Sequence, residues 1–370
     1  MNEQKLDTYQ AISVIVTVML SHIILNLPNH LIETTGSSSI LNLIYVFSIV
    51  LLICWIVTKI FKLFPNNDII DICEYAAGKA IKILYTILLC GYLLVISALV
   101  IRTFAESLSL IYFPNIRLEI IILFFIIMSA IMNLLGFKAI ARTSVILLPI
   151  ILIAMLVVFI YSTSDFTVQR SLPLLGYSAF DTFVKGLGNI FAFSSALIIV
   201  VMAPLISDGN RMRKVGFVSL IIYGICVIAG TVCLLFLIPS VGDVSNTLTI
   251  YVVSKRVSLG SFVQSIDSLF ILVWIICIFN YLAISLHFAI YLFKKIVNVK
   301  HELSLIYPFS AIVFVISMLP KNSSDLIFYE NTVYKYSSII FVFFISFAIL
   351  ICAYLKKKHE KGVKHFEKNN

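Results

Sequence analysis

Long apolar segments recur from one end of this 370-residue chain to the other. A run of about 18 or more apolar residues spans the hydrocarbon core of a bilayer as a helix. Backbone groups in lipid must be hydrogen-bonded within the protein, which leaves helical bundles and closed β-barrels. A barrel needs segments of about ten residues that alternate between polar and apolar. The unbroken Ile, Leu, Val and Phe runs lack this alternation, so we predict an all-α integral membrane protein.

Ten transmembrane helices can be assigned, joined by short connections. The composition agrees, since 61% of the residues are hydrophobic and only 12% are charged. No connection is long enough for an inserted soluble domain, so residues 1–370 are predicted to form a single transmembrane domain. The predicted spans are 8–32, 39–61, 81–110, 117–136, 142–161, 181–206, 215–239, 260–292, 303–320 and 333–355.

Lys and Arg residues predict the orientation of the chain. They concentrate in the even-numbered connections and in the basic tail, residues 356–370, and the first odd-numbered connection has none. Cytoplasmic connections carry this excess, so both termini are predicted to be cytosolic. The net charge of +9 reflects the same bias and does not indicate a nucleic-acid partner. The tail is read as an anchor with a solvated end, or as a contact with anionic membrane lipid.

The first apolar segment is interrupted by the stretch LSHIILNLPNHL, residues 20–31. Pro28 lacks an N–H and frees the carbonyl of Ile24, and Ser21 and His22 lie about one turn earlier. These residues predict a short unwound stretch near the middle of the membrane, lining a cavity. A plain proline kink, with Ser21 bonded back to a carbonyl, explains the same residues, so the first helix alone leaves both readings open.

The sixth segment contains a matching interruption. It reads GLGNIFAFSSALIIVVMAPLI over residues 186–206, with two early glycines, then Ser194 and Ser195, then Pro204. Interrupted helices in corresponding positions of two halves are typical of transporter-type binding sites. The free N–H groups of half-helices also suit a carboxylate. The pairing therefore favours a ligand site over two unrelated kinks.

Four motifs occur in the order and spacing of a known family. They are SHIILNLP (21–28), FPNNDIIDICEYAAGK (64–79), GFKAIARTSVILLP (136–149) and SLFILVWIICIF (268–279). By these motifs the chain resembles the B subunits of spore germinant receptors, the GerAB-type family within the amino acid–polyamine–organocation superfamily. It departs from the family pattern where Ser21 and Ile23 replace glycines, and where Ser194 and Ser195 replace an acidic residue or glycine.

The resemblance implies a LeuT-like fold of five-plus-five inverted repeats, about 8–161 and 181–355, with interrupted helices 1 and 6. It implies a nutrient-sensing subunit in the spore inner membrane that binds a small germinant, such as an amino acid. Germinant receptor A and C subunits would be its partners, and ion release its possible output. The pocket would lie between helices 1, 3, 6 and 8. Its candidate residues are Ser21, His22, Ile24, Tyr92, Ile96, Phe193, Ser194, Ser195, Cys277 and Tyr281.

Three charged residues lie in the outer third of helices 3 and 8. Arg102 and Glu106 are one turn apart, and Asp267 lies on the other helix. Charges at membrane depth face protein or a cavity. They are read either as a gate or ion path, or as a structural ion pair.

Missing motifs exclude several classes of function. It has no hydrolase, metalloprotease or P-loop motif, no zinc-ligand spacing and no cofactor motif, so we expect no enzyme, no metal and no cofactor. A receptor subunit and an amino-acid permease both remain. A permease is expected to carry a coupling Lys in helix 5, and none occurs between Thr143 and Tyr161. A nutrient-gated ion channel formed within the receptor assembly is a third function class, and the sequence does not distinguish it from the receptor subunit.

Overall fold

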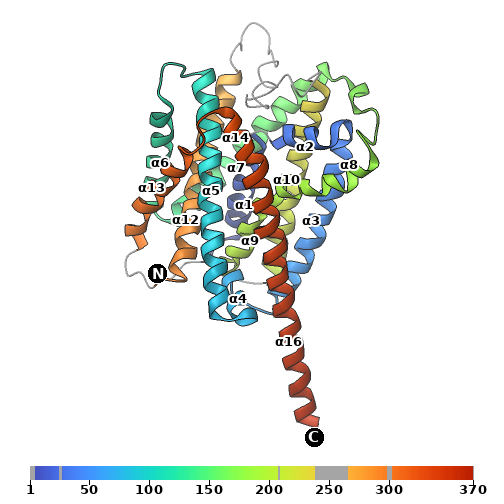
Figure 1. The fold of residues 1–370 in the computed structure, drawn as a ribbon, viewed down its shortest axis with the longest axis vertical. Coiled ribbons are helices and arrows are strands. Elements are labelled where there is room, and N and C mark those ends of the chain that lie inside the picture. The colour runs from blue at the N-terminus through green and yellow to red at the C-terminus, as the bar shows by residue number, and fades with distance from the viewer. Residues whose placement is uncertain (1–4, 25–26, 207–208, 238–265, 298–301, 370) are drawn as a thin grey trace.

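The computed structural model describes residues 5–24, 27–206, 209–237, 266–297 and 302–369. The side chains of residues 24, 266–270, 302 and 361–369 lie outside that description. The described chain is a bundle of helices of several windings, with no strand in these ranges (Figure 1).

The first half of the chain contains seven α-helices and three short 3-10 turns. The α-helices are α1 (Thr8–Ile24), α2 (Leu27–Thr35), α3 (Ser39–Phe61), α4 (Ile69–Ala77), α5 (Lys79–Ile111), α6 (Leu118–Leu134) and α7 (Phe137–Ser162). The 3-10 turns are η1 (Gly36–Ser38), η2 (Thr163–Asp165) and η3 (Val168–Ser171).

The second half changes winding more often. It contains α8 (Ala179–Phe183), the 3-10 helix η4 (Lys185–Ala196), α9 (Leu197–Val201), the 3-10 turn η5 (Ala203–Leu205), α10 (Gly209–Leu237), α12 (Ile266–Lys294), the 3-10 turn η8 (Glu302–Leu305), α13 (Ile306–Ser317), α14 (Ser323–Tyr329), the π-helix η9 (Glu330–Tyr334), α15 (Lys335–Ser337), the π-helix η10 (Ser338–Ile345) and α16 (Ser346–Asn369).

Seven helical stretches in the described part of the chain are long and apolar enough to cross a membrane. Three more apolar helices are shorter, with 10–17 residues, and correspond to α1, α6 and α13. Each of the ten sequence-predicted spans overlaps one of these ten helices. The protein is therefore an all-helical membrane protein, and the number of spans beyond seven stays a prediction.

Helix α1 is the centre of the bundle. Its residues from Ala11 to Ile23 are all buried, and it packs against α7, α10 and α12. A helix that is apolar on all sides must be enclosed by others. The polar residues within it are satisfied locally, since Ser13, Thr17 and Ser21 each donate to the carbonyl four residues earlier.

The structure corrects the unwound stretch that was predicted at Ser21 and His22. Helix α1 includes both residues and extends to Ile24, and the Ser21 hydroxyl donates to the Thr17 carbonyl at 2.9 Å, as in the alternative reading of a plain kink. Pro28 is the second residue of α2, where a missing N–H costs little. Helix α1 ends at Ile24 and α2 begins at Leu27, and residues 25 and 26 lie outside the described residues.

The sixth predicted span is held tightly against α3. Gly186 leaves no room for a side chain, since an added Cβ would meet Asn42 Nδ2 at 2.3 Å. Asn42 in turn donates to the Thr182 carbonyl and accepts from Asn189. The glycine is thus explained by close packing at the start of η4.

Both described ends of the chain lie at the end of the bundle where α4 lies. The Leu6 N–H donates to the Leu205 carbonyl, and Lys356 Nζ donates to the Tyr75 carbonyl at 2.7 Å. Helix α16 then extends past the bundle, while α2 and α8 lie at the opposite end (Figure 1).

Candidate functional site

A small buried cavity lies between α1, α2, α5, η4 and η9. Its volume is about 30 Å³, which holds about two water molecules. It is lined by His22, Leu27, His30, Ile96, Leu99, Val100, Phe191, Glu330 and Tyr334. In this conformation the cavity admits small polar groups, and a whole amino acid requires its walls to move.

Tyr334 fills the centre of this region. Its hydroxyl lies 3.3 Å from His22 Nδ1 and 3.2 Å from Ser194 Oγ. Its ring stacks on the His22 ring with a centroid distance of 5.5 Å, and the edge of Phe191 meets it at 5.5 Å. One side chain from η9 therefore joins α1 and η4.

The structure brings four of the sequence-predicted residues to this region. His22 and Ile96 line the cavity, and Ser194 contacts Tyr334. Tyr281 reaches it from α12, where its ring meets His22 edge-on with a centroid distance of 5.1 Å. Four separate elements thus contribute to one cluster, as the predicted meeting of helices 1, 3, 6 and 8 requires.

Tyr92 lies beside the cluster without lining the cavity. Its hydroxyl lies 3.0 Å from Ser338 Oγ and joins α5 to η10. Ile96 is one turn further along α5 and does face the cavity. The Tyr92 hydroxyl therefore positions the wall that carries Ile96.

Other predicted residues lie outside the lining of the cavity. Ser21 is bonded within α1, Phe193 packs between Phe47 and Tyr223, and Cys277 is fully buried in α12. Ser195 is half-buried. Positions three apart align in the 3-10 winding of η4, so Ser194 lies on the side that carries Phe191 and Phe193 lies on another side. The side chain of Ile24 lies outside the described residues.

Glu330 is a buried carboxylate that the sequence analysis missed. It is 9% exposed, and its Oε1 accepts from the Thr103 hydroxyl. Its Oε2 has no hydrogen-bond partner and lies 3.5 Å from His30 Nε2. His30 Nδ1 lies 3.6 Å from Glu33 Oε2 on its other side. The signal was the four-residue spacing of Glu330 and Tyr334, which was overlooked because the tenth span was started at residue 333.

Arg102 and Glu106 form an ion pair on α5, with 2.7 Å between Nε and Oε1. Arg102 Nη1 also donates to the Ser317 carbonyl at 3.4 Å, and the Ser323 hydroxyl donates to Glu106 Oε2 at 3.0 Å. The pair is thus held by α13 and by the start of α14. The side chain of Asp267 lies outside the described residues, so its place in this network stays a prediction.

The elements around the cavity have unusual windings. Runs of 3-10 helix longer than four residues are uncommon, and η4 has twelve. π-Helical turns are rare in proteins, and those that occur are often at functional sites. The π-helix η9 carries both Glu330 and Tyr334. Three of the residues that line the cavity, Phe191, Glu330 and Tyr334, therefore lie on windings other than α.

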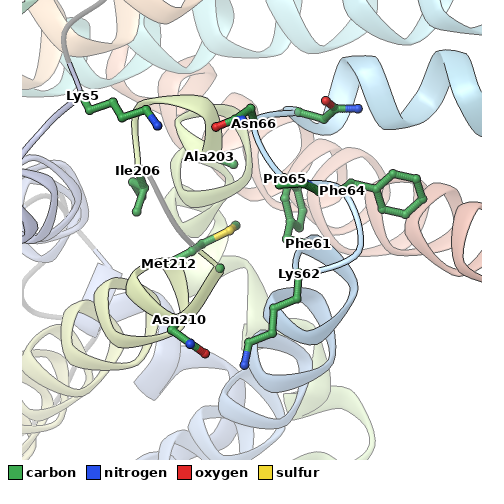
Figure 2. A pocket seen from close by; sticks show the side chains of 12 residues that line it. Lys5, Phe61, Lys62, Phe64, Pro65, Asn66, Ala203, Ile206, Asn210 and Met212 are labelled. Carbon is green, nitrogen blue, oxygen red and sulfur yellow. The ribbon is translucent and has the colours of Figure 1, made fainter.

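A larger hollow of about 340 Å³ lies at the α4 end of the bundle. Figure 2 shows the polar side chains of Lys5, Lys62 and Asn66 around this hollow, together with Phe61 and Met212. Both lysines are exposed, as is usual for charged side chains at a membrane boundary. No predicted site residue lies here, so the hollow is separate from the buried cavity.

Two solved structures among those that match show this fold. A Na⁺-coupled sialic acid symporter in a substrate-bound, outward-open state matches with a TM-score of 0.62 and 12% identity, over 91% of this chain and 79% of that chain. MhsT in complex with L-phenylalanine matches with a TM-score of 0.64 and 13% identity, over 96% and 99%. The fold is therefore that of LeuT-type transporters, and the molecule is a helical membrane protein of that architecture.

The chain belongs to the spore germination protein family, whose model matches residues 5–326. Spore germination protein A2 of Bacillus subtilis (strain 168) is 24% identical over 96% of this chain and 97% of that protein. Spore germination protein B2 of the same organism is 23% identical over 98% of both. The predicted resemblance is confirmed across almost the whole length, and these relatives are spore germination proteins.

Proposed function

We propose that this chain is the nutrient-sensing subunit of a spore germinant receptor. It binds a small germinant, such as an amino acid, in the cavity around Tyr334. It then signals germination together with receptor A and C subunits, through ion release. The observation that carries the proposal is the bridge from Tyr334 to His22 and Ser194, because one ligand placed there touches α1, η4 and η9 together.

The proposed architecture is ten transmembrane helices in two inverted repeats of five, about 8–161 and 181–355. Helices α1 and α2 are the two halves of interrupted helix 1, and η4 to η5 form interrupted helix 6. Membership of the germination family supports a location in the spore inner membrane, and the Lys and Arg distribution supports cytosolic positions for both ends. No catalytic step is assigned to it.

Beside the residues at the cavity, the proposed site keeps the predicted Ser21, Ile24, Tyr92, Phe193, Ser195 and Cys277 as its supporting shell. Each lies on a helix that contributes to the cavity or packs against one that does. Their role is to hold the walls in place, so their replacement changes the nutrient concentration needed and leaves the choice of nutrient intact.

An amino-acid permease is the second candidate. The fold supports it, since one structural neighbour is described in complex with L-phenylalanine. The two functions differ in what a blocked cavity does. Spores lose the response to nutrient if the chain is a receptor, whereas vegetative cells lose uptake of labelled amino acid if it is a permease.

Ser194→Phe tests the proposal. Ser194 is 1% exposed, so the added ring must occupy the space around Tyr334. We expect nutrient-triggered germination to be lost, while the protein stays in the membrane and a trigger that bypasses nutrient receptors still works. Ser48→Phe on the exposed face of α3 is the matched control. A normal nutrient response from abundant Ser194→Phe protein would place the binding site elsewhere.

A further inference from the structure

We propose that Glu330 binds the protonated amine of the ligand that enters this cavity, so that the site selects primary amines over their uncharged analogues. This inference rests on the proposed function, since it specifies the chemistry of the same cavity. It concerns a residue on η9, which the sequence analysis did not include in the site.

The first argument is the unsatisfied carboxylate. Glu330 is nine-tenths buried, and its Oε2 lacks a hydrogen-bond partner although Oε1 is bonded to Thr103. A buried acceptor without a donor costs free energy, and more so when it is charged. Oε2 accepts no hydrogen bond and has only the 3.5 Å ion-pair contact with His30 Nε2, so it can accept a donor that enters the cavity.

The second argument is the weakness of the resident partner. His30 Nε2 is 3.5 Å from Glu330 Oε2, which is longer than a hydrogen bond of good geometry. His30 is also shared with Glu33, whose Oε2 lies 3.6 Å from Nδ1. An incoming ammonium group, with three N–H donors, competes well with this loose contact.

The third argument is the chemistry of the remaining wall. Apart from its histidines, Glu330 and Tyr334, the cavity is lined by Leu27, Ile96, Leu99, Val100 and Phe191. A charge-assisted hydrogen bond gains strength where water is excluded. The Tyr334 hydroxyl, on the same π-helical turn, is a second acceptor for the ammonium.

The fourth argument concerns room. The cavity of about 30 Å³ takes an ammonium-sized group, while the rest of a ligand needs the space that Tyr334 occupies. The Tyr334 hydroxyl is held by contacts of 3.2 and 3.3 Å, longer than typical O–H hydrogen bonds. Displacing this side chain gives up these long hydroxyl contacts together with its ring contacts to His22 and Phe191, and it joins the Glu330 end of the cavity to Ser194.

The experiment compares Glu330→Gln with Glu33→Gln in the full chain, purified in lipid nanodiscs. Glutamine keeps the volume and the acceptor for Thr103 but removes the charge. Glu33 also contacts His30 but does not line the cavity, so its variant is a matched control. The probes are the common L-amino acids and their isosteric 2-hydroxy acids, and binding is read as a rise in melting temperature with ligand concentration.

We expect the parent to bind at least one amino acid and to discriminate against its hydroxy-acid isostere. Loss of a hydrogen bond to a charged group should weaken the binding of that amino acid about tenfold or more in Glu330→Gln. Glu33→Gln should bind within about twofold of the parent. Glu330→Asp, which retains the charge, should keep more affinity than Glu330→Gln.

Equal affinity of the parent and Glu330→Gln would overturn the inference, as would equal binding of the hydroxy acid by the parent. Equal losses in Glu330→Asp and Glu330→Gln would overturn it too, because charge would then not be the property that matters. In each case loss of the nutrient response in Ser194→Phe would leave the proposed function standing. If no amino acid binds the parent and Ser194→Phe responds normally, both proposals fall.

Discussion

At the scale of single residues, two ion pairs of the same kind meet very different surroundings. Arg102 and Glu106 have side chains 8% and 14% exposed, whereas Arg117 and Glu119 are 80% and 48% exposed. Exposed pairs contribute about 0–1 kcal/mol because water and salt screen them. Breaking a buried pair costs about 3–5 kcal/mol because one charge is left uncompensated. We therefore expect the Arg102–Glu106 pair to contribute to the stability of the fold and the Arg117–Glu119 pair to contribute little.

Arg102→Ala is expected to lower the amount of folded protein in the membrane, because Glu106 is left buried without its counter-charge. Glu106→Gln in the same chain should restore part of it, and Arg117→Ala should have little effect. The measurements are protein abundance and the melting temperature of purified protein. Normal abundance of Arg102→Ala with altered ion flux or germination would instead support the gate reading.

Sequence patterns predicted individual site residues better than their contacts. His22 and Ser194 were recognised because polar side chains in an apolar run demand partners. Tyr334 and Glu330 were missed because they lie at the edge of a segment whose polar residues resemble a loop. Glu330 Oε1 accepts a hydrogen bond from Thr103 on α5, a contact between residues more than two hundred positions apart. Such a partner is a property of packing and leaves no local signature.

At the scale of elements, α4 is clasped by the end of α12. Asp68 caps α4 and is fully buried, and its Oδ2 accepts from the Tyr291 hydroxyl at 2.6 Å. Lys295 Nζ lies 2.9 Å from Asp68 Oδ2 and 2.7 Å from Asp71 Oδ2. One lysine therefore holds two carboxylates of the neighbouring element.

The clasp shifts the titration of its members. Burial raises the pKa of Asp68 above its usual range, against the charge of Lys295. Burial acts in the same direction on Asp71, but the hydrogen bond and charge of Lys295 outweigh it and lower the pKa of Asp71. Burial is likewise outweighed at Lys295, whose pKa the two aspartates raise. The charged forms of Lys295 and Asp71 therefore stabilise the folded protein at neutral pH. The charged form of Asp68 destabilises it at that pH because it is buried, and protonation of Asp68 removes this cost.

Lys295→Met is expected to lower the melting temperature at about pH 7, because Asp68 is then buried beside no counter-charge. The deficit relative to the parent should shrink at about pH 5, since the raised pKa of Asp68 lets it take up a proton as the pH falls, which removes the uncompensated charge. Lys358→Met, at an exposed residue of α16, is the control. A deficit that is unchanged or larger in acid would contradict this account of the clasp.

The long helices could be predicted because apolar content alone defines them. Each predicted span overlaps an observed helix, although seven reach membrane-spanning length in the described part of the chain. The windings could not be predicted, since apolar runs do not distinguish α, 3-10 and π turns. The separate short helices α2, α4, α8 and α14 were absorbed into spans or read as connections, because they are shorter than the windows that reveal apolar periodicity.

At the scale of the whole molecule, the two chain ends make the topology testable. Both lie beside the α4 end, as an even number of membrane crossings requires. A reporter fused after Asn370 is expected to be active only in the cytosol, because the basic connections lie at that end. Protease protection of the same fusion in sealed vesicles provides an independent check. A signal from outside would refute the orientation and the repeat assignment together.

The long 3-10 helix η4 is also longer along its axis than an α-helix of the same number of residues. A residue advances about 2.0 Å along a 3-10 axis and about 1.5 Å along an α axis. The twelve residues of η4 therefore cover about 24 Å, where the same residues as α-helix cover about 18 Å. Rewinding this one segment shortens it by about 6 Å and rotates everything beyond Ala196, without breaking the chain or bending a hinge. The axial length of this one element can thus change by about 6 Å through its winding alone.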